Sequence, residues 1–185
     1  MVEGVEETFF LMITIVLSVF IAIITFGAGE LCADEFEDLA IKRITTMYIE
    51  GQKFGDLVLG ARARFDFLYV DGLLVKASIA SGKTPDWLKW HLGHFGSPQA
   101  RGEELFVLRY ETYKPFDFDP FKIAVNGMYL SEKEVLTKLT RIPTGSLPSG
   151  AVGDLAFVVP RSSDGVYNII YEGNEIRIDL DKFRN

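Results

Sequence analysis

Hydrophobic residues are concentrated near the start of the chain. Residues 8–27 read TFFLMITIVLSVFIAIITFG and contain no charged side chain. A helix of about 20 residues is about 30 Å long, which matches the hydrocarbon core of a bilayer. A cleaved signal peptide is the alternative, but its apolar core is usually shorter and follows Lys or Arg, whereas Glu3, Glu6 and Glu7 precede this run. We therefore predict that residues 1–29 form an N-terminal segment with one retained transmembrane helix, whose first partner is the lipid bilayer.

One face of this predicted span carries small and hydroxyl-bearing residues. Thr14, Ser18 and Ala22 recur every four residues, so they share a helical face. Such side chains let helices in lipid approach closely, which makes this face a candidate packing surface for copies of the chain or for other membrane subunits. Alternatively, the hydroxyl groups bond back to their own helix. Because the first basic residues are Lys42 and Arg43, well beyond the run, the positive-inside rule leaves the orientation open.

Residues 30–51 continue with helical periodicity. Acidic residues come first and basic residues later, which is the order that the helix dipole favours, and Gly51 is a stop signal. The pattern predicts an amphipathic connecting helix over residues 30–51. Its apolar positions recur at intervals of one, three or four residues and are Phe36, Leu39, Ala40, Ile44, Met47 and Tyr48.

Strand patterns dominate the rest of the chain, which we assign to a β-rich extramembrane domain over residues 52–185. Runs of β-branched and aromatic residues alternate with Asp-Gly, Asn-Gly and Glu-Gly pairs, which are typical of hairpin turns. We predict three hairpins and two further strands. The hairpins join 65–70 to 73–79 through Asp71-Gly72, 121–125 to 128–130 through Asn126-Gly127, and 166–171 to 175–180 through Glu172-Gly173-Asn174, and the further strands are 104–112 and 154–160.

Two short helices are predicted within this domain. The first starts at residues 84–86, TPD, where a hydroxyl group can cap the helix and proline suits its first position, and it ends at Gly93. The second starts at Ser131, which with Glu134 has capping-box spacing, and runs through Leu139. The predicted fold class is therefore α+β: a transmembrane helix, an amphipathic continuation, and a mainly antiparallel β-rich domain with short helices.

Composition and charge exclude several classes of protein. The chain has 185 residues, a hydrophobic fraction of 48% and a formal charge of −7. This acidic balance and the lack of a basic cluster argue against a nucleic-acid partner, because phosphate neutralisation supplies most nucleic-acid affinity. Cys32 is the only cysteine, so the chain cannot form an internal disulfide or a cysteine-built zinc site.

Candidate chemistry in the sequence is sparse. His91 and His94 could share a helical face as metal ligands, but Gly93 lies between them and we favour a structural role. Asp117 and Asp119 are similar to the acidic pair that holds a divalent cation in sugar-transfer enzymes, yet no nucleotide-binding α/β pattern accompanies them. The sequence contains no phosphate-binding loop or nucleophile elbow. We therefore expect no enzyme activity, no cofactor and no bound metal.

Two segments carry a resemblance to a known family. Residues 4–20, GVEETFFLMITIVLSVF, followed by an amphipathic stretch and a β-rich domain, resemble type IV pilin-like proteins. Residues 81–93, SGKTPDWLKWHLG, resemble a Pro-x-Trp segment of archaeal pilin-like membrane proteins with class III signal peptides. The resemblance implies a cell-surface filament subunit with an extracytoplasmic domain, in which Glu6 or Glu7 registers neighbouring subunits. The chain departs from that pattern because no basic residue precedes Gly4.

Two functional hypotheses follow. The first is a membrane-anchored assembly protein, as a pilin-like or minor filament subunit. The alternative is a non-catalytic accessory subunit of a larger membrane complex. Many identical copies in a helical array would favour the first hypothesis, and one copy among unlike chains would favour the second.

Overall fold

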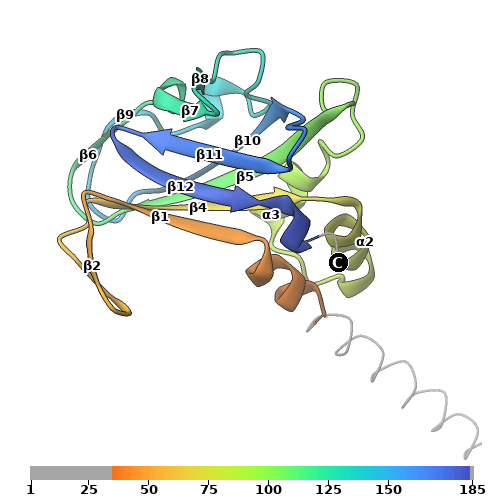
Figure 1. Cartoon of the computed structure of the whole chain (residues 1–185), viewed down its shortest axis with the longest axis horizontal. Coiled ribbons are helices and arrows are strands. Elements are labelled where there is room, and N and C mark those ends of the chain that lie inside the picture. The colour runs from red at the N-terminus through yellow and green to blue at the C-terminus, as the bar shows by residue number, and fades with distance from the viewer. Residues whose placement is uncertain (1–34, 184–185) are drawn as a thin grey trace, which may run out of the picture.

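A computed structural model describes residues 35–183. One sheet has four antiparallel strands in the order β1-β4-β5-β10 (Figure 1). These strands are β1 (Ile44–Ile49), β4 (Ala63–Val70), β5 (Glu103–Thr112) and β10 (Val152–Pro160). This sheet is called the larger sheet because most of its strands are longer than those in the second sheet. A second four-stranded sheet has the order β12-β11-β7-β8. Its strands are β7 (Ile123–Val125), β8 (Met128–Tyr129), β11 (Val166–Tyr171) and β12 (Asn174–Asp179).

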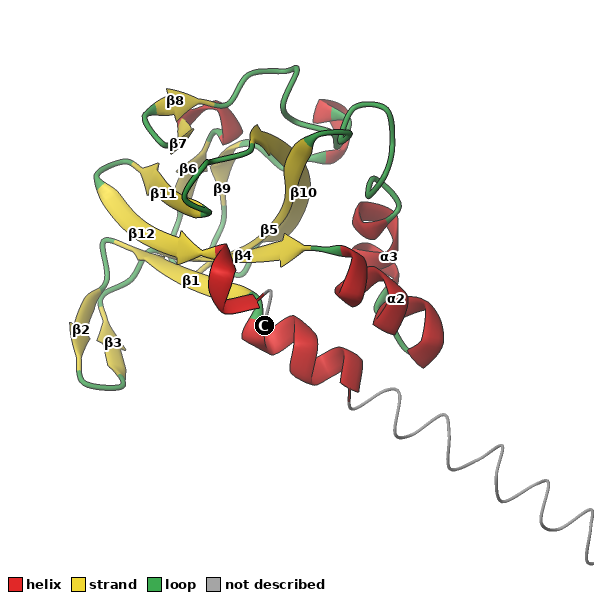
Figure 2. Cartoon of the chain, turned by 45° about the vertical axis from the view of Figure 1, so that its right-hand side comes forward, coloured by secondary structure: helices red, strands yellow, loops and turns green. Residues whose placement is uncertain are grey.

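Two strand pairs and several short helices complete the described chain (Figure 2). The pairs are β2 (Gln52–Phe54) with β3 (Leu57–Leu59), and β6 (Phe116–Phe118) with β9 (Gly145–Leu147). The helices are residues 35–42, α2 (Gly72–Ser81), α3 (Asp86–Leu92), η1 (Pro120–Lys122), η2 (Leu139–Arg141) and η3 (Leu180–Phe183). No helix within residues 35–183 is long and apolar enough to cross a bilayer.

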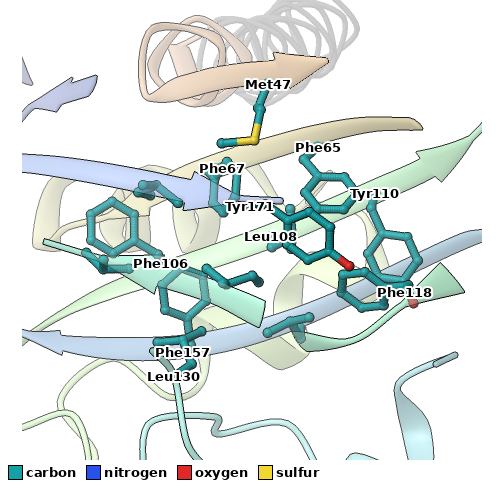
Figure 3. Close-up of a cluster of buried hydrophobic side chains, with 14 of the residues drawn as sticks. Met47, Phe65, Phe67, Phe106, Leu108, Tyr110, Phe118, Leu130, Phe157 and Tyr171 are labelled. Carbon is teal, nitrogen blue, oxygen red and sulfur yellow. The ribbon is translucent and has the colours of Figure 1, made fainter. Parts of the chain in front are cut away.

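Strand alternation builds two cores, one on each side of the larger sheet. On β4, Phe65 and Phe67 face the inner core, whereas Leu68 and Val70 face the outer core. The inner core is rich in aromatic residues, and Phe65 packs edge-on against Tyr171 of the second sheet with ring centroids 4.9 Å apart (Figure 3). The outer core lies under α2, α3 and helix 35–42. The domain therefore has three layers: helices, larger sheet and smaller sheet.

The structure confirms the α+β class, with mainly antiparallel sheets and a few short helices. The hairpins at Asn126-Gly127 and Glu172-Gly173 are confirmed, and all four of these residues have positive φ, as type I′ turns require. Helix α3 is also confirmed, although its N-cap is Pro85. The predicted strands at 104–112 and 154–160 correspond to β5 and β10.

The predicted connecting helix over residues 30–51 is wrong beyond residue 42. Helix 35–42 ends there, and residues 44–49 form strand β1. Met47 and Ile49 alternate into the inner core, and the whole strand pairs with β4. The apolar positions of residues 44–49 fit both the helical period of about 3.6 residues and the strand period of two. Pairing with β4 selects the strand. The folded domain consequently includes residues 35–51, not only residues 52–185.

The predicted hairpin at Asp71-Gly72 is also wrong. Asp71 is the N-cap of α2 and accepts a 2.8 Å hydrogen bond from the Leu74 amide, and Gly82 ends the helix at φ 62°. Leu74, Ala77 and Ser78 lie on the buried side of the helix. Asp-Gly can cap a helix as well as form a turn, and the short apolar run after it fits both structures.

The predicted helix from Ser131 through Leu139 does not form. The capping-box contact exists, because the Ser131 amide donates to Glu134 Oε2 at 2.9 Å. The chain then extends along β10, where Val135 forms a bridge with Phe157. Backbone pairing with the edge of the larger sheet therefore overrides the local helix signal.

Candidate functional site

A row of polar residues crosses the outer face of the larger sheet, where the helical layer ends. Thr46, Asp66, Arg109 and Asp154 lie directly opposite one another on β1, β4, β5 and β10. The Thr46 hydroxyl donates to Asp66 at 2.6 Å, and Arg109 Nη1 lies 4.0 Å from Asp154 Oδ2. Arg64, two residues before Asp66, forms a 2.9 Å ion pair with it. This row separates the helix-covered part of the sheet face from the open part.

His91 connects α3 to this row. Its side chain is nearly buried, and Nε2 lies 2.7 Å from Asp154 Oδ1. Its other nitrogen, Nδ1, lies 3.4 Å from the Thr137 hydroxyl, which accepts a 2.8 Å hydrogen bond from the Ala156 amide. His91 thus joins α3, β10 and the loop that follows Val135.

Two tryptophans of α3, together with Lys138 and Arg141, line a cleft beside His91. The Arg109 guanidinium lies 4.4 Å from the Trp87 ring centroid, and that of Arg141 lies 5.9 Å from Trp90. Trp90 is 73% exposed. The cleft has a volume of about 470 Å³. Its wall therefore offers an aromatic surface with cationic groups at the edge, a combination suited to a polar or planar partner group.

An apolar groove adjoins this cleft and shares Trp87 with it. Leu68 and Val107 of the outer core, together with Phe36 and Ala40 of helix 35–42, contribute to its lining. Its volume is about 290 Å³. The groove and the cleft both lie on the helical side of the larger sheet, and ionisable side chains contribute to the lining of both.

The geometry around His91 supports a structural role. Both ring nitrogens face partners on β10 or its neighbouring loop, and the Thr137 hydroxyl is held by a backbone amide. Burial, with nearby His91, lowers the pKa of His94. Among residues 35–183, no three His, Cys, Asp or Glu side chains lie close enough together to hold a metal ion.

The acidic pair Asp117 and Asp119, the other candidate from the sequence, has local contacts. Asp119 caps η1 by accepting a 2.9 Å hydrogen bond from the Phe121 amide. Asp117 is exposed on β6 and lies opposite Ser146 of β9. The backbone amide of Asp119 also donates a 3.2 Å hydrogen bond to the Tyr171 hydroxyl. Asp119 therefore shapes the turn that links β6 to η1.

An apolar surface stands apart from these hollows. The β2–β3 hairpin projects from the two sheets (Figures 1 and 2). Phe54, Leu57 and Leu59 on it are exposed. Exposed apolar patches on soluble domains mark interaction sites. The hairpin is therefore a second candidate functional surface.

The assembly residues predicted from the sequence, Glu6, Glu7, Thr14, Ser18 and Ala22, lie outside the described residues. Sequence reasoning did not find the polar row, because its members come from strands far apart in the chain. One signal was present: Asp66, Arg109 and Asp154 each interrupt or adjoin a run of apolar residues in their strands.

Comparison with known proteins leaves the family open. No protein family, curated protein or solved structure matches this chain.

Proposed function

We propose that this chain is a single-pass membrane protein whose extracytoplasmic domain acts in assembly, as a pilin-like or minor filament subunit at the cell surface. Its partners are the lipid bilayer and copies of itself or other membrane subunits. The alternative is a non-catalytic accessory subunit of a larger membrane complex. In either role the protein is not an enzyme and carries no cofactor.

The sequence of residues 8–27 supports the anchor. This run is uncharged and long enough to span the hydrocarbon core. Helix 35–42 starts shortly after it and packs on the folded domain through Phe36. A span joined by a short connection to a packed domain is the arrangement of a single-pass anchor.

The β2–β3 hairpin is the observation that carries the assembly role. Three large apolar side chains, Phe54, Leu57 and Leu59, are exposed on a projecting two-stranded pair. Burial of these side chains against a partner is favourable by about 25 cal/mol per Å² of apolar surface, so the hairpin favours association. A protein partner for the hairpin is common to the filament and the accessory hypotheses.

Deletion of residues 1–29 tests the anchor. The full chain should float with lipid vesicles in a density gradient, whereas the truncated chain should remain in the soluble fraction with its folded far-UV circular dichroism spectrum. A full chain that stays with soluble proteins would refute the anchor. A truncated chain that is unfolded would refute the proposed division into anchor and domain.

Complex size in mild detergent tests the hairpin. Phe54→Ser with Leu57→Ser should reduce the sedimentation-derived mass of the complex. Gln52→Ser, on the same hairpin but polar, is the matched control and should leave the mass unchanged. An unchanged mass in the double variant would refute the assembly role of the hairpin.

The predicted span is tested in the same assay. Ser18→Leu or Ala22→Leu should weaken association, because a bulky side chain separates helices that pack at small residues. Val16→Leu, on another face, is the control. If Ser18→Leu and Ala22→Leu leave the mass of the complex as large as the control does, the span acts only as a tether.

Glu6→Gln and Glu7→Gln distinguish the two hypotheses. In a pilin-like assembly, one of these substitutions should impair subunit registration and reduce the mass of the complex. An accessory subunit should tolerate both. The stoichiometry of the purified complex gives an independent answer, since many identical chains support the filament and one copy among unlike chains supports the accessory role.

A further inference from the structure

One face of α3 lines the cleft beside His91. Trp87, Trp90 and His91 are three or four residues apart, so they share this face of the helix. The Trp87 ring lies next to the Arg109 guanidinium, 4.4 Å from its centroid, whereas Trp90 is 73% exposed. Trp90 therefore presents an open aromatic surface to a ligand in the cleft.

A short turn adds two cations to the lining. The Arg141 amide donates a 2.8 Å hydrogen bond to the Lys138 carbonyl, and residues three apart in such a 3₁₀ turn lie on the same side. The segment is held at both ends, because Val135 forms a bridge with β10 and Ile142 is buried in the inner core. Within residues 35–183, neither Lys138 nor Arg141 forms an ion pair with an acidic side chain. Both cations can therefore pair with an anionic ligand.

Asp154 is the only acidic group among the described residues that line the cleft. Its Oδ1 lies 2.7 Å from His91 Nε2, which orients the carboxylate. Its Oδ2 lies 4.0 Å from Arg109 Nη1, which is too long for a hydrogen bond, so this oxygen can accept one from a ligand hydroxyl. Burial, with nearby His91, lowers the pKa of His94 from 6.5, so His94 is neutral near pH 7. The lining thus carries two cations against one carboxylate.

This set of groups matches a sugar that carries a carboxylate. The C–H face of a sugar ring is apolar and packs on the face of an indole. A guanidinium pairs closely with a carboxylate, and sugar hydroxyls can donate to Asp154. The cleft volume of about 470 Å³ is typical of small-molecule sites. A nucleotide fits less well, because its phosphate would be repelled by Asp154 and the sequence has no phosphate-binding loop.

We infer that the cleft beside His91 binds a hexuronate saccharide, with one sugar ring stacked on Trp90 and its carboxylate held by Lys138 and Arg141. Asp154, oriented by His91, accepts a hydrogen bond from a sugar hydroxyl. This inference goes beyond the proposed assembly role. It does not depend on the membrane anchor, because every residue of the cleft belongs to the folded domain.

Tryptophan fluorescence of the full-length chain tests this binding directly, because Trp87 and Trp90 are its only tryptophans. The disaccharides of galacturonate and glucuronate are titrated into the chain in a detergent without a sugar headgroup. At least one of them should change the emission in a saturable way. The methyl ester of that disaccharide keeps the sugar rings but loses the charge, and it should bind about tenfold more weakly.

Calorimetric titration of variants tests the individual contacts. Arg141→Gln and Lys138→Gln should each weaken binding of the acid by about tenfold and reduce its advantage over the ester. Lys133→Gln, an exposed lysine outside the cleft, is the matched control and should leave binding unchanged. Trp90→Ala should also weaken binding by about tenfold. Trp90→Phe should weaken it by less, because it retains an aromatic ring.

Several outcomes would overturn the inference. Neither hexuronate disaccharide changing the tryptophan emission would remove the saccharide site. An ester that binds as tightly as the acid would remove the role of the two cations. Adenosine monophosphate that binds more tightly than either disaccharide would assign the cleft to a nucleotide.

The mass of the complex in mild detergent separates this site from the assembly role. Trp90→Ala and Arg141→Gln should leave that mass unchanged, because the β2–β3 hairpin is intact in both variants. A reduced mass would assign the cleft to contact between subunits and overturn the saccharide site. A failed saccharide titration with an unchanged mass would leave the assembly role in place.

Discussion

Arg43→Met should destabilise the folded domain because Arg43 joins three segments at one buried position. The Arg43 side chain is 3% exposed. Its Nε and Nη2 lie 3.1 and 2.8 Å from Asp71 Oδ2, which makes it the cationic partner of the α2 N-cap residue. Nη1 donates to the Leu39 carbonyl near the end of helix 35–42 at 3.2 Å, and Nη2 donates to the Phe183 carbonyl of η3 at 3.4 Å.

The magnitude follows from what the substitution leaves behind. Methionine fills much of the volume, but Asp71 Oδ2 and the Leu39 and Phe183 carbonyls lose the donors that Arg43 supplies. Removing one partner of a buried ion pair costs about 3–5 kcal/mol. Because the Asp71 side chain is 17% exposed, water compensates in part and we expect about 3 kcal/mol. For a chain of this size, that loss lowers Tm by about 6–12 °C.

The assay is thermal unfolding of the full-length chain in mild detergent, followed by near-UV circular dichroism of the aromatic core. Asp71→Asn retains an N-cap acceptor and removes the charge. In combination with Arg43→Met it should therefore destabilise the domain by less than the sum of the single effects. Lys89→Met, which breaks an exposed ion pair with Asp86, is the control and should cost about 0.5 kcal/mol.

Two results would refute this reasoning. If Arg43→Met lowers Tm no more than Lys89→Met does, Arg43 does not hold helix 35–42, α2 and η3 together. If the loss of unfolding free energy in the double variant equals the sum of the losses in the two single variants, the ion pair with Asp71 is not the interaction that stabilises the domain.

Three further predictions concern the sheets and α3. A Cβ on Gly153 would lie 2.1 Å from the Tyr110 hydroxyl oxygen, so Gly153→Ala should cost about 1–3 kcal/mol in thermal unfolding, and Tyr110→Phe in the same chain should recover part of the loss. Burial raises the pKa of Tyr171 from 10.0 to about 12. Its unfolded form ionises first, so the free energy of unfolding should fall as pH rises between these values, and Tyr171→Phe should reduce the fall. His91→Ala with His94→Ala should lower Tm and leave the metal content by mass spectrometry unchanged.

Each of these predictions has a control and a contradicting result. Val152→Ala, beside Gly153 on β10, should be nearly neutral, and equal losses would refute the steric argument. Tyr129→Phe, on an exposed side chain, should leave the alkaline stability profile unchanged. An identical profile for Tyr171→Phe and the parent chain would refute the role of that phenol. Stoichiometric metal that disappears in the histidine double variant would assign His91 and His94 to a metal site.

The sequence alone determined the features that depend on neighbouring residues. Asn126-Gly127 and Glu172-Gly173 form turns because their backbone needs positive φ, which glycine permits and which asparagine tolerates. Short continuous runs of apolar residues identified β5 and β10, and the Pro-Asp start with Gly93 identified α3. The uncharged run at 8–27 predicts a membrane span for the same reason, since its length and composition are local properties.

Tertiary structure decided between helix and strand in segments whose apolar residues fit both periodicities. Residues 44–49 became β1 because β4 offers a pairing edge and the inner core accepts Met47 and Ile49, and residues 72–81 became α2 because the outer face of the same sheet accepts a helix. The polar row and the His91 contacts arise from strand register and from α3 packing on β10, which bring together residues as far apart as 63 positions. Short apolar runs do not encode their partners, so only the complete fold selects between the alternatives.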